Sequence, residues 1–288
     1  MKSPITGKEM TLTKERRSME FRKETFEIVF HFYNCQDSGE QFTTTELDEL
    51  NMNQIHNQYR DKFNIPYSDK ISNIRKKHQL PGTKMSEVLG FGINTYRQYE
   101  SGEIPTMANA RLIQMVDDPT FFIEMVELCT TIDEESKVKY IQRAQQLALD
   151  NAKNNFDLNF KDYLLGNHFP DIYSGYRIPN LEKFTEMVIY FSHKLSPFKT
   201  KLNKLLFYAD FSMFKQSCFS ISGIRYYAID KGPVPNNFQS IFEYLVNQGE
   251  IEICNTEFPN WYVGEQLKPQ KNRKFNNALF SESELNIL

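Results

Sequence analysis

The chain has 288 residues, with 34 basic and 37 acidic side chains, and its net charge of −3 excludes a global positive field that would attract nucleic acid. Hydrophobic residues make up 40% of the chain, which is enough to build the cores of two or three domains. No apolar run approaches the roughly 18 residues of a membrane span, and no secretion signal is evident after Met1. Four scattered cysteines without paired spacing are typical of a reduced, cytoplasmic protein. They are Cys35, Cys129, Cys218 and Cys254.

Residues 1–64 predict a small β-rich unit. Residues 26–33 are rich in aromatic and β-branched side chains, which favour a strand. A run of threonines followed by acidic residues then predicts a helix over residues 43–59, because threonine caps helix N-termini and acids suit the first turn.

Residues 65–131 predict five short helices. Gly90 and Gly92 end the second, and Asn94 begins the third. The spacing of the first three helices indicates inward-facing side chains at Ile71, Ile74, Leu80, Met85, Val88, Leu89, Tyr96 and Tyr99. The apolar stripes expected for the last two helices are Ala108, Leu112 and Met115, and Phe121, Phe122, Met125 and Leu128.

The outward side chains of the third helix suit the reading of base edges. Asparagine and glutamine can bond adenine, and arginine can bond guanine. The candidate DNA contacts are Asn94, Thr95, Arg97 and Gln98, with Lys84 placed to reach a phosphate. The segment of residues 60–97 contains eight basic residues and three acidic ones, so a local positive patch is expected. A solvated helix face is the alternative reading of this charge.

Residues 132–179 predict a connector helix with a thin apolar stripe, followed by a turn-prone linker over residues 155–179. The stripe indicates packing on a neighbouring element or, alternatively, on a second copy of the chain.

Residues 180–288 mix both types of structure. An amphipathic helix begins near Leu181, and residues 202–214 are apolar on nearly every side, which predicts a central, buried helix. A strand over 223–229, a helix over 236–246 and strands over 251–254 and 261–263 follow. Ser281 and Glu284 have capping-box spacing so close to the end that we expect the natural chain to continue beyond residue 288.

The expected fold class is therefore mainly α with small β elements (α+β). No nucleophile elbow, phosphate-binding loop or zinc-protease motif is present, and the five histidines show no ligand spacing. We predict a protein without enzymatic activity, metal or cofactor.

Residues 74–105 resemble the helix-turn-helix of the Xre/Cro-like repressors. The matching segments are Ile74-Arg75, Ser86 to Gly90, Tyr99-Glu100-x-Gly102 and Pro105. The resemblance implies DNA binding, and an ion pair of Glu100 with Arg75 that supports the fold without touching DNA. Gly82 departs from the family, which commonly has glutamine there. A helix-turn-helix that serves only for dimerisation is the alternative.

Residues 1–64 followed by this block resemble the two-part antitoxins that join a zinc ribbon to a helix-turn-helix. The ribbon frame is visible in Ser3-Pro4-Ile5-Thr6-Gly7 and in Cys35-Gln36-Asp37-Ser38-Gly39. Three of the four ligand positions carry hydroxyls, at Ser3, Thr6 and Ser38, and zinc needs about four thiolate or imidazole ligands. We therefore expect a metal-free, ribbon-like unit.

Residues 180–288 resemble the Panacea antitoxin domain. The resemblance rests on the helix Lys201-Leu202-Asn203-Lys204-Leu205-Leu206-Phe207-Tyr208-Ala209-Asp210, on Tyr227, and on Lys231-Gly232-Pro233-Val234-Pro235. It implies direct neutralisation of a toxin, in many cases one that blocks translation. The candidate toxin contacts are Lys204, Tyr208, Tyr227, Lys231 and Pro233. A solvated lysine stripe and a core tyrosine are the alternatives.

These resemblances together predict a cytoplasmic antitoxin of a type II toxin–antitoxin pair, with four parts: residues 1–64, 65–131, 132–179 and 180–288. We expect a homodimer on a palindromic operator, because one short recognition helix reads few base pairs. A ligand-sensing transcriptional regulator and a proteolytic adaptor are the alternative functions.

Overall fold

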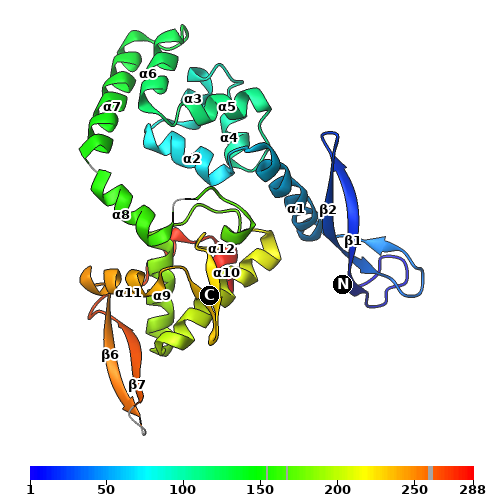
Figure 1. Cartoon of the computed structure of the whole chain (residues 1–288). Coiled ribbons are helices and arrows are strands. Elements are labelled where there is room, and N and C mark those ends of the chain that lie inside the picture. Colours follow the sequence, from blue (N-terminus) through cyan, green and yellow to red (C-terminus); the bar gives the residue numbers. More distant parts are fainter. Residues whose placement is uncertain (154, 167, 259–261) are drawn as a thin grey trace.

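The computed structural model describes residues 1–153, 155–166, 168–258 and 262–288. Within these ranges the chain is mainly helical with three small antiparallel sheets, which confirms the expected fold class. Figure 1 shows an N-terminal hairpin beside helix α1, a cluster of helices from α2 to α7, and a C-terminal part built on α9 and α10. No helix in the described ranges is long and apolar enough to cross a membrane.

The N-terminal sheet is a long hairpin with a short third strand. Its strands are β1 (Thr11–Phe21), β2 (Glu24–Asn34) and β3 (Gln41–Phe42), in the order β1-β2-β3. The predicted strand is part of β2, whereas β1 was not predicted. Its sequence is mostly polar, and Arg22 and Lys23 form the turn with φ angles of 50° and 68°, where asparagine and glycine are the usual signal. Arg22 donates to the carbonyls of Ile104 and Pro105 at 2.8 and 3.0 Å, so the turn is tied to the helical cluster.

Helix α1 (Thr45–Phe63) links the hairpin to the rest of the chain. The Thr44 hydroxyl accepts a hydrogen bond from the Leu47 amide at 3.3 Å, which fixes the start of the helix close to the predicted position. The helix continues four residues past the predicted Tyr59 and ends at Asn64, whose φ of 51° is left-handed. Phe26 and Ile28 of β2 pack against Ile55 and Tyr59 of α1.

The helical cluster consists of α2 (Ser68–Lys77), α3 (Gly82–Val88), α4 (Thr95–Glu100), α5 (Met107–Met115) and α6 (Pro119–Leu128). All eight inward-facing residues predicted for the first three helices are buried, which confirms that part of the prediction.

The stripe predicted for α5 is wrong, and the stripe predicted for α6 is confirmed only at Phe122 and Met125, which pack in the core. Ala108 and Met115 of α5 are exposed, and this helix buries Ala110 and Ile113. In α6 the buried residues are Phe122 and Val126, whereas Phe121 and Leu128 are exposed. Both helices carry apolar residues on more than one face, so the tertiary contacts decide which face is buried.

Two helices connect the cluster to the C-terminal part. Helix α7 (Glu134–Lys153) packs on the core of the cluster through Tyr140 and Ala144. Helix α8 (Asn155–Leu165) occupies residues expected to form a linker. Its last residues, Leu164 and Leu165, are buried in the C-terminal core, which explains why the segment is helical despite its turn-prone composition.

The C-terminal part surrounds two long helices, α9 (Leu181–Leu195) and α10 (Lys199–Ser217). The other elements are β4 (Tyr226–Ile229), β5 (Gly232–Pro235), α11 (Phe238–Asn247), β6 (Ile251–Phe258), β7 (Tyr262–Pro269) and α12 (Glu282–Ile287). The described residues also contain two short 3₁₀ helices, Ile172–Ser174 before α9 and Asn277–Leu279 before α12. Its core contains Phe184, Met187, Leu202, Leu206, Ile241, Phe242, Ile251 and Leu267.

Several C-terminal predictions need correction. Helix α10 is not buried on every side, because Tyr208 and Phe211 are exposed. Residues 232–235 form strand β5, so only Asp230 and Lys231 make the turn from β4. Strands β6 and β7 form a hairpin longer than predicted, and Trp261 lies outside the described residues.

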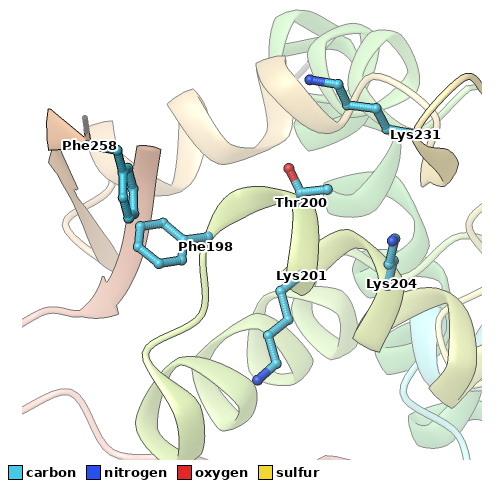
Figure 2. Close-up of a pocket in the computed structure, with 6 residues that line it drawn as sticks. All are labelled: Phe198, Thr200, Lys201, Lys204, Lys231 and Phe258. Carbon is cyan, nitrogen blue, oxygen red and sulfur yellow. The ribbon is translucent and has the colours of Figure 1, made fainter. Parts of the chain in front are cut away.

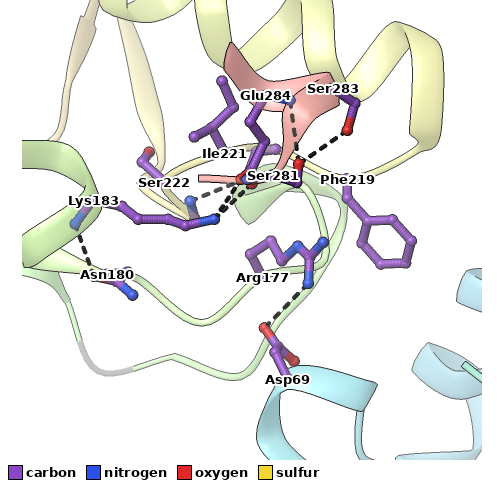
Figure 3. A network of polar contacts seen from close by, with 12 residues as sticks. Asp69, Arg177, Asn180, Lys183, Phe219, Ile221, Ser222, Ser281, Ser283 and Glu284 are labelled. Carbon is purple, nitrogen blue, oxygen red and sulfur yellow. Dashed lines mark hydrogen bonds and ion pairs between the residues drawn. The ribbon is translucent and has the colours of Figure 1, made fainter. Parts of the chain in front are cut away.

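Polar contacts tie α9 and the segment before it to two distant elements (Figure 3). Arg177 lies 3.9 Å from Asp69 of α2. Lys183 of α9 contacts both carboxylate oxygens of Glu284 at 2.6 and 2.8 Å. The predicted capping box is confirmed, since Ser281 and Glu284 each accept a backbone N–H of the other.

The predicted pair of Arg75 and Glu100 is also confirmed. The Arg75 Nε donates to a Glu100 oxygen at 2.7 Å, and its Nη1 donates to the Leu80 carbonyl at 2.8 Å. Both side chains are mostly buried, so the pair connects α2 to the end of α4 inside the cluster.

Arg75→Met should lower the free energy of unfolding by about 2 kcal/mol, because Glu100 loses its partner and the Leu80 carbonyl loses a donor. Lys62→Met, which breaks a more exposed pair with Glu24, should change it by less than ~0.5 kcal/mol. Urea unfolding of both variants checks this. Equal losses for the two would show that Arg75 does not support the cluster.

Candidate functional site

Helix α4 presents the predicted DNA-reading side chains on the surface. Tyr96 and Tyr99 hold its inner face: the Tyr96 hydroxyl donates to the Ile71 carbonyl, and the Tyr99 hydroxyl accepts from Asn109, both at 2.8 Å. The outer face therefore carries exposed Asn94, Arg97 and Gln98 and half-buried Thr95.

The glycine that departs from the repressor pattern lies directly under Arg97. A Cβ on Gly82 would come within 2.7 Å of the Arg97 Cγ, so only glycine leaves space for this side chain as it lies across the start of α3. The departure thus has a local structural reason, which the sequence alone did not reveal.

The expected positive patch is largely cancelled. Five of the eight basic residues between residues 60 and 97 form ion pairs: Lys62, Lys70, Arg75, Lys77 and Lys84. Lys84, the predicted phosphate contact, bonds Glu87 at 2.7 Å. Glu24 and Asp117, which lie outside the counted segment, neutralise three of the others. Of the basic residues predicted to contact DNA, Arg97 alone makes no ion pair among the described residues.

A cluster of aromatic rings lies on α10. Phe207 contacts Tyr208, Phe211 and Tyr226, with ring centroids 5.6, 4.0 and 5.5 Å apart. We call Phe207, Tyr208, Phe211 and Tyr226 the α10 aromatic cluster. Tyr208 is 62% exposed and Phe211 is 49% exposed, so half of the cluster faces solvent.

A buried carboxylate holds this cluster in place. Asp210 accepts hydrogen bonds from the Tyr226 hydroxyl at 2.7 Å, from the Ser222 hydroxyl at 2.5 Å and from the amides of Ile221 and Ser222 at 2.8 Å. Burial raises the pKa of Asp210, and the donors act in the opposite direction. Tyr226 is thereby fixed against Phe207 and Phe211.

The other predicted toxin contacts lie outside this cluster, on α10, on β4, on β5 and on the turn between these two strands. Lys204 and Lys231 line a common pocket beside the start of α10. Tyr227 follows Tyr226 on β4 and so points to the opposite face of that strand. Pro233 is half-buried on β5, opposite Ala228.

A groove that sequence reasoning missed lies between the N-terminal elements and α10. It has a volume of about 970 Å³. The N-terminal elements contribute Val29, His31 and Leu50 to its lining, and α10 contributes Phe211 and Phe214. The α10 aromatic cluster therefore borders the N-terminal unit, a neighbourhood that no local pattern in the sequence indicates.

The ribbon positions also come together. The Thr6 hydroxyl lies 3.4 Å from the Cys35 sulfur. Hydrogen bonds from Ser38, Thr6 and Ser3 lower the pKa of the Cys35 thiol to about 6. Three hydroxyls thus surround one sulfur where the resemblance implies four thiolates.

Two family models match the chain. Residues 1–126 match the model of MqsA, the antitoxin component of a bacterial toxin–antitoxin system, and residues 202–288 match the model of the SocA-like antitoxins with a Panacea domain. The chain thus joins two regions that are each similar to an antitoxin family. We refer to them as the MqsA-like region and the Panacea domain. No curated protein and no solved structure gave a match.

The MqsA-like region does not fit a zinc ion. A structural zinc site has about four thiolate or imidazole ligands, and of the four ribbon positions only Cys35 supplies one. No group of three or more His, Cys, Asp or Glu side chains in the described part of the chain has the geometry to hold a metal. The ribbon frame is supported instead by hydrogen bonds among hydroxyls, the sulfur and the backbone.

Ser3→Cys, Thr6→Cys and Ser38→Cys combined should create a four-cysteine site that binds one zinc per chain, because these side chains already surround Cys35. The unaltered chain should bind none. Metal analysis of both proteins checks this, with exposed Ser101, Thr120 and Ser212 changed to cysteine as the matched control. One zinc in the unaltered chain, or none in the triple variant, would contradict it.

Proposed function

We propose that the chain is the antitoxin of a type II toxin–antitoxin pair, which neutralises its cognate toxin by direct binding and represses its own operon. Antitoxin families match both ends, which supports a regulatory rather than an enzymatic role. The α10 aromatic cluster carries the toxin-binding part of this proposal. Aromatic side chains exposed as a group are typical of protein interfaces, because burying them removes much apolar area from water.

The toxin would dock on the Panacea domain. Exposed Tyr208 and Phe211 would form the centre of the contact, with Lys204, Lys231, Tyr227 and Pro233 around it. The family resemblance suggests a toxin that blocks translation. Such a partner and the operator are both found in the cytoplasm.

The MqsA-like region would bind operator DNA through α4. This helix has only six residues and reads few base pairs, so specific binding needs two half-sites about one helical turn apart. A homodimer on a palindromic operator follows. With the positive patch largely cancelled, Arg97 would be the main cationic contact to a base.

A ligand-sensing regulator remains the second candidate. The groove of about 970 Å³ is the observation that favours it. That groove lies between the MqsA-like region and α10 rather than inside residues 180–288, so it also fits a surface that a toxin covers.

Arg97→Ala should weaken operator binding by about ten- to a hundredfold, because an arginine contact to guanine is lost. Gly82→Ala should weaken it similarly, since the new methyl group displaces Arg97, while the thermal midpoint stays unchanged or rises. Electrophoretic mobility shift on the native promoter checks both. Toxin neutralisation should persist in each variant; if it falls together with DNA binding in a folded protein, the two surfaces are not separate.

Tyr208→Ala combined with Phe211→Ala should abolish rescue of cells that express the cognate toxin, the product of the adjacent reading frame. The reason is the loss of the exposed half of the α10 aromatic cluster. Tyr163→Ala with Phe121→Ala is the matched control, since those rings are 66% and 43% exposed on α8 and α6. Cell viability is the readout, and rescue by the first variant would refute the proposed surface.

A further inference from the structure

A pocket beside the start of α10 gathers positive charge. Its volume is about 460 Å³, and it lies where α10, the β4–β5 turn and the end of β6 come together. Figure 2 shows the lining side chains, which are Phe198, Thr200, Lys201, Lys204, Lys231 and Phe258.

The charge of the three pocket lysines is uncompensated within the described part of the chain. No ion pair to Lys201, Lys204 or Lys231 is found among the described residues, and no carboxylate lines the pocket. The neighbouring Lys199, in contrast, pairs with Glu265 at 2.5 Å. A partner that supplies negative charge would therefore complement the positive charge of this surface.

Two aromatic rings form the apolar wall of the pocket. The ring centroids of Phe198 and Phe258 are 5.5 Å apart. Gly264 of β7 makes this arrangement possible, since a Cβ there would lie 2.8 Å from the Phe258 ring and 3.0 Å from the Phe198 ring. The pocket thus offers an apolar contact next to the charged one.

Two of the pocket lysines share a face of α10 with the exposed rings of the α10 aromatic cluster. Lys201, Lys204, Tyr208 and Phe211 are spaced three, four and three residues apart, which places them on one face of α10, and all four are exposed. One docked protein can therefore cover the lysines and the aromatic rings together.

We propose that this pocket receives an acidic segment of the toxin, with its carboxylates on the three lysines and an apolar side chain on the two phenylalanine rings. This inference rests on the proposed function and adds the chemistry of the partner. A nucleic acid is the other polyanion to consider, but duplex-binding proteins make about six to ten phosphate contacts, and three lysines are few for that task. Figure 1 also places α10 in a different part of the molecule from α4.

The test compares two variants of the full chain with equal changes of charge. One replaces Lys201, Lys204 and Lys231 by glutamate. The matched control replaces Lys194, Lys271 and Lys274 by glutamate. These lysines are exposed in the same part of the chain and do not line the pocket. The probe is the protein encoded by the adjacent reading frame, and its dissociation constant is measured at about 50 and 300 mM salt, where screening separates charged contacts from apolar ones.

The pocket variant should bind the toxin roughly ten- to a hundredfold more weakly at low salt, with a shallower salt dependence, while the control binds like the unaltered chain. Carbodiimide coupling, which joins amines to carboxylates in contact, should link the pocket lysines to toxin Asp or Glu side chains. Circular dichroism of both variants checks that they are folded.

Equal affinities of the two variants would overturn the pocket assignment while toxin binding itself, and hence the proposed function, stands. A pocket variant that loses operator affinity instead of toxin affinity would identify a nucleic-acid contact and also overturn it. If the unaltered chain does not bind the adjacent gene product at all, the proposed function fails and this inference fails with it.

Discussion

Two asparagine side chains of α1 hold the halves of this chain together. The Asn53 and Asn57 amides donate to the carbonyls of Ser217 and Cys218 at 3.2 and 3.1 Å. These carbonyls lie at the C-terminal end of α10, where the last C=O groups of a helix have no N–H donor within the helix. The asparagine side chains of α1 supply the missing donors. Tyr67, Tyr176 and Phe214 stack beside this contact with centroid distances of 5.7 and 6.2 Å.

The same helix also supports the helical cluster. Arg60 is buried in α1 and donates to the Gly102 carbonyl, which follows α4, at 2.5 Å. Burial lowers the pKa of Arg60 to about 10, and it stays charged at neutral pH. Helix α1 is therefore a common support for α4 and α10. The proposed DNA-binding and toxin-binding surfaces share one frame, although they lie on different elements.

The sequence predicted this architecture best where local signals agreed. Apolar periodicity and the Arg75–Glu100 pair were sufficient to predict helices α2 to α4 and the residues that they bury. The sequence failed to predict the buried face of α5 and predicted that of α6 only in part, because apolar residues lie on several faces of both helices. It also failed to predict β1, which is polar and lacks a glycine turn. The charge count failed for a different reason. Asp117 pairs with both Lys70 and Lys77 from far along the chain, and a count along the sequence does not include such partners.

The candidate surfaces were predicted only in part. Family motifs pointed to Tyr208 and Lys204, but the exposure of Phe211 and the walls formed by Phe198 and Phe258 depend on contacts between distant elements. Hydroxyl-radical footprinting of the full chain, alone and bound to its cognate toxin, tests the central claim most directly. The account predicts that the toxin slows oxidation of Tyr208 and Phe211 and leaves Tyr163 and Phe121 unchanged. Unchanged oxidation of Tyr208 and Phe211 in a neutralised complex would contradict it.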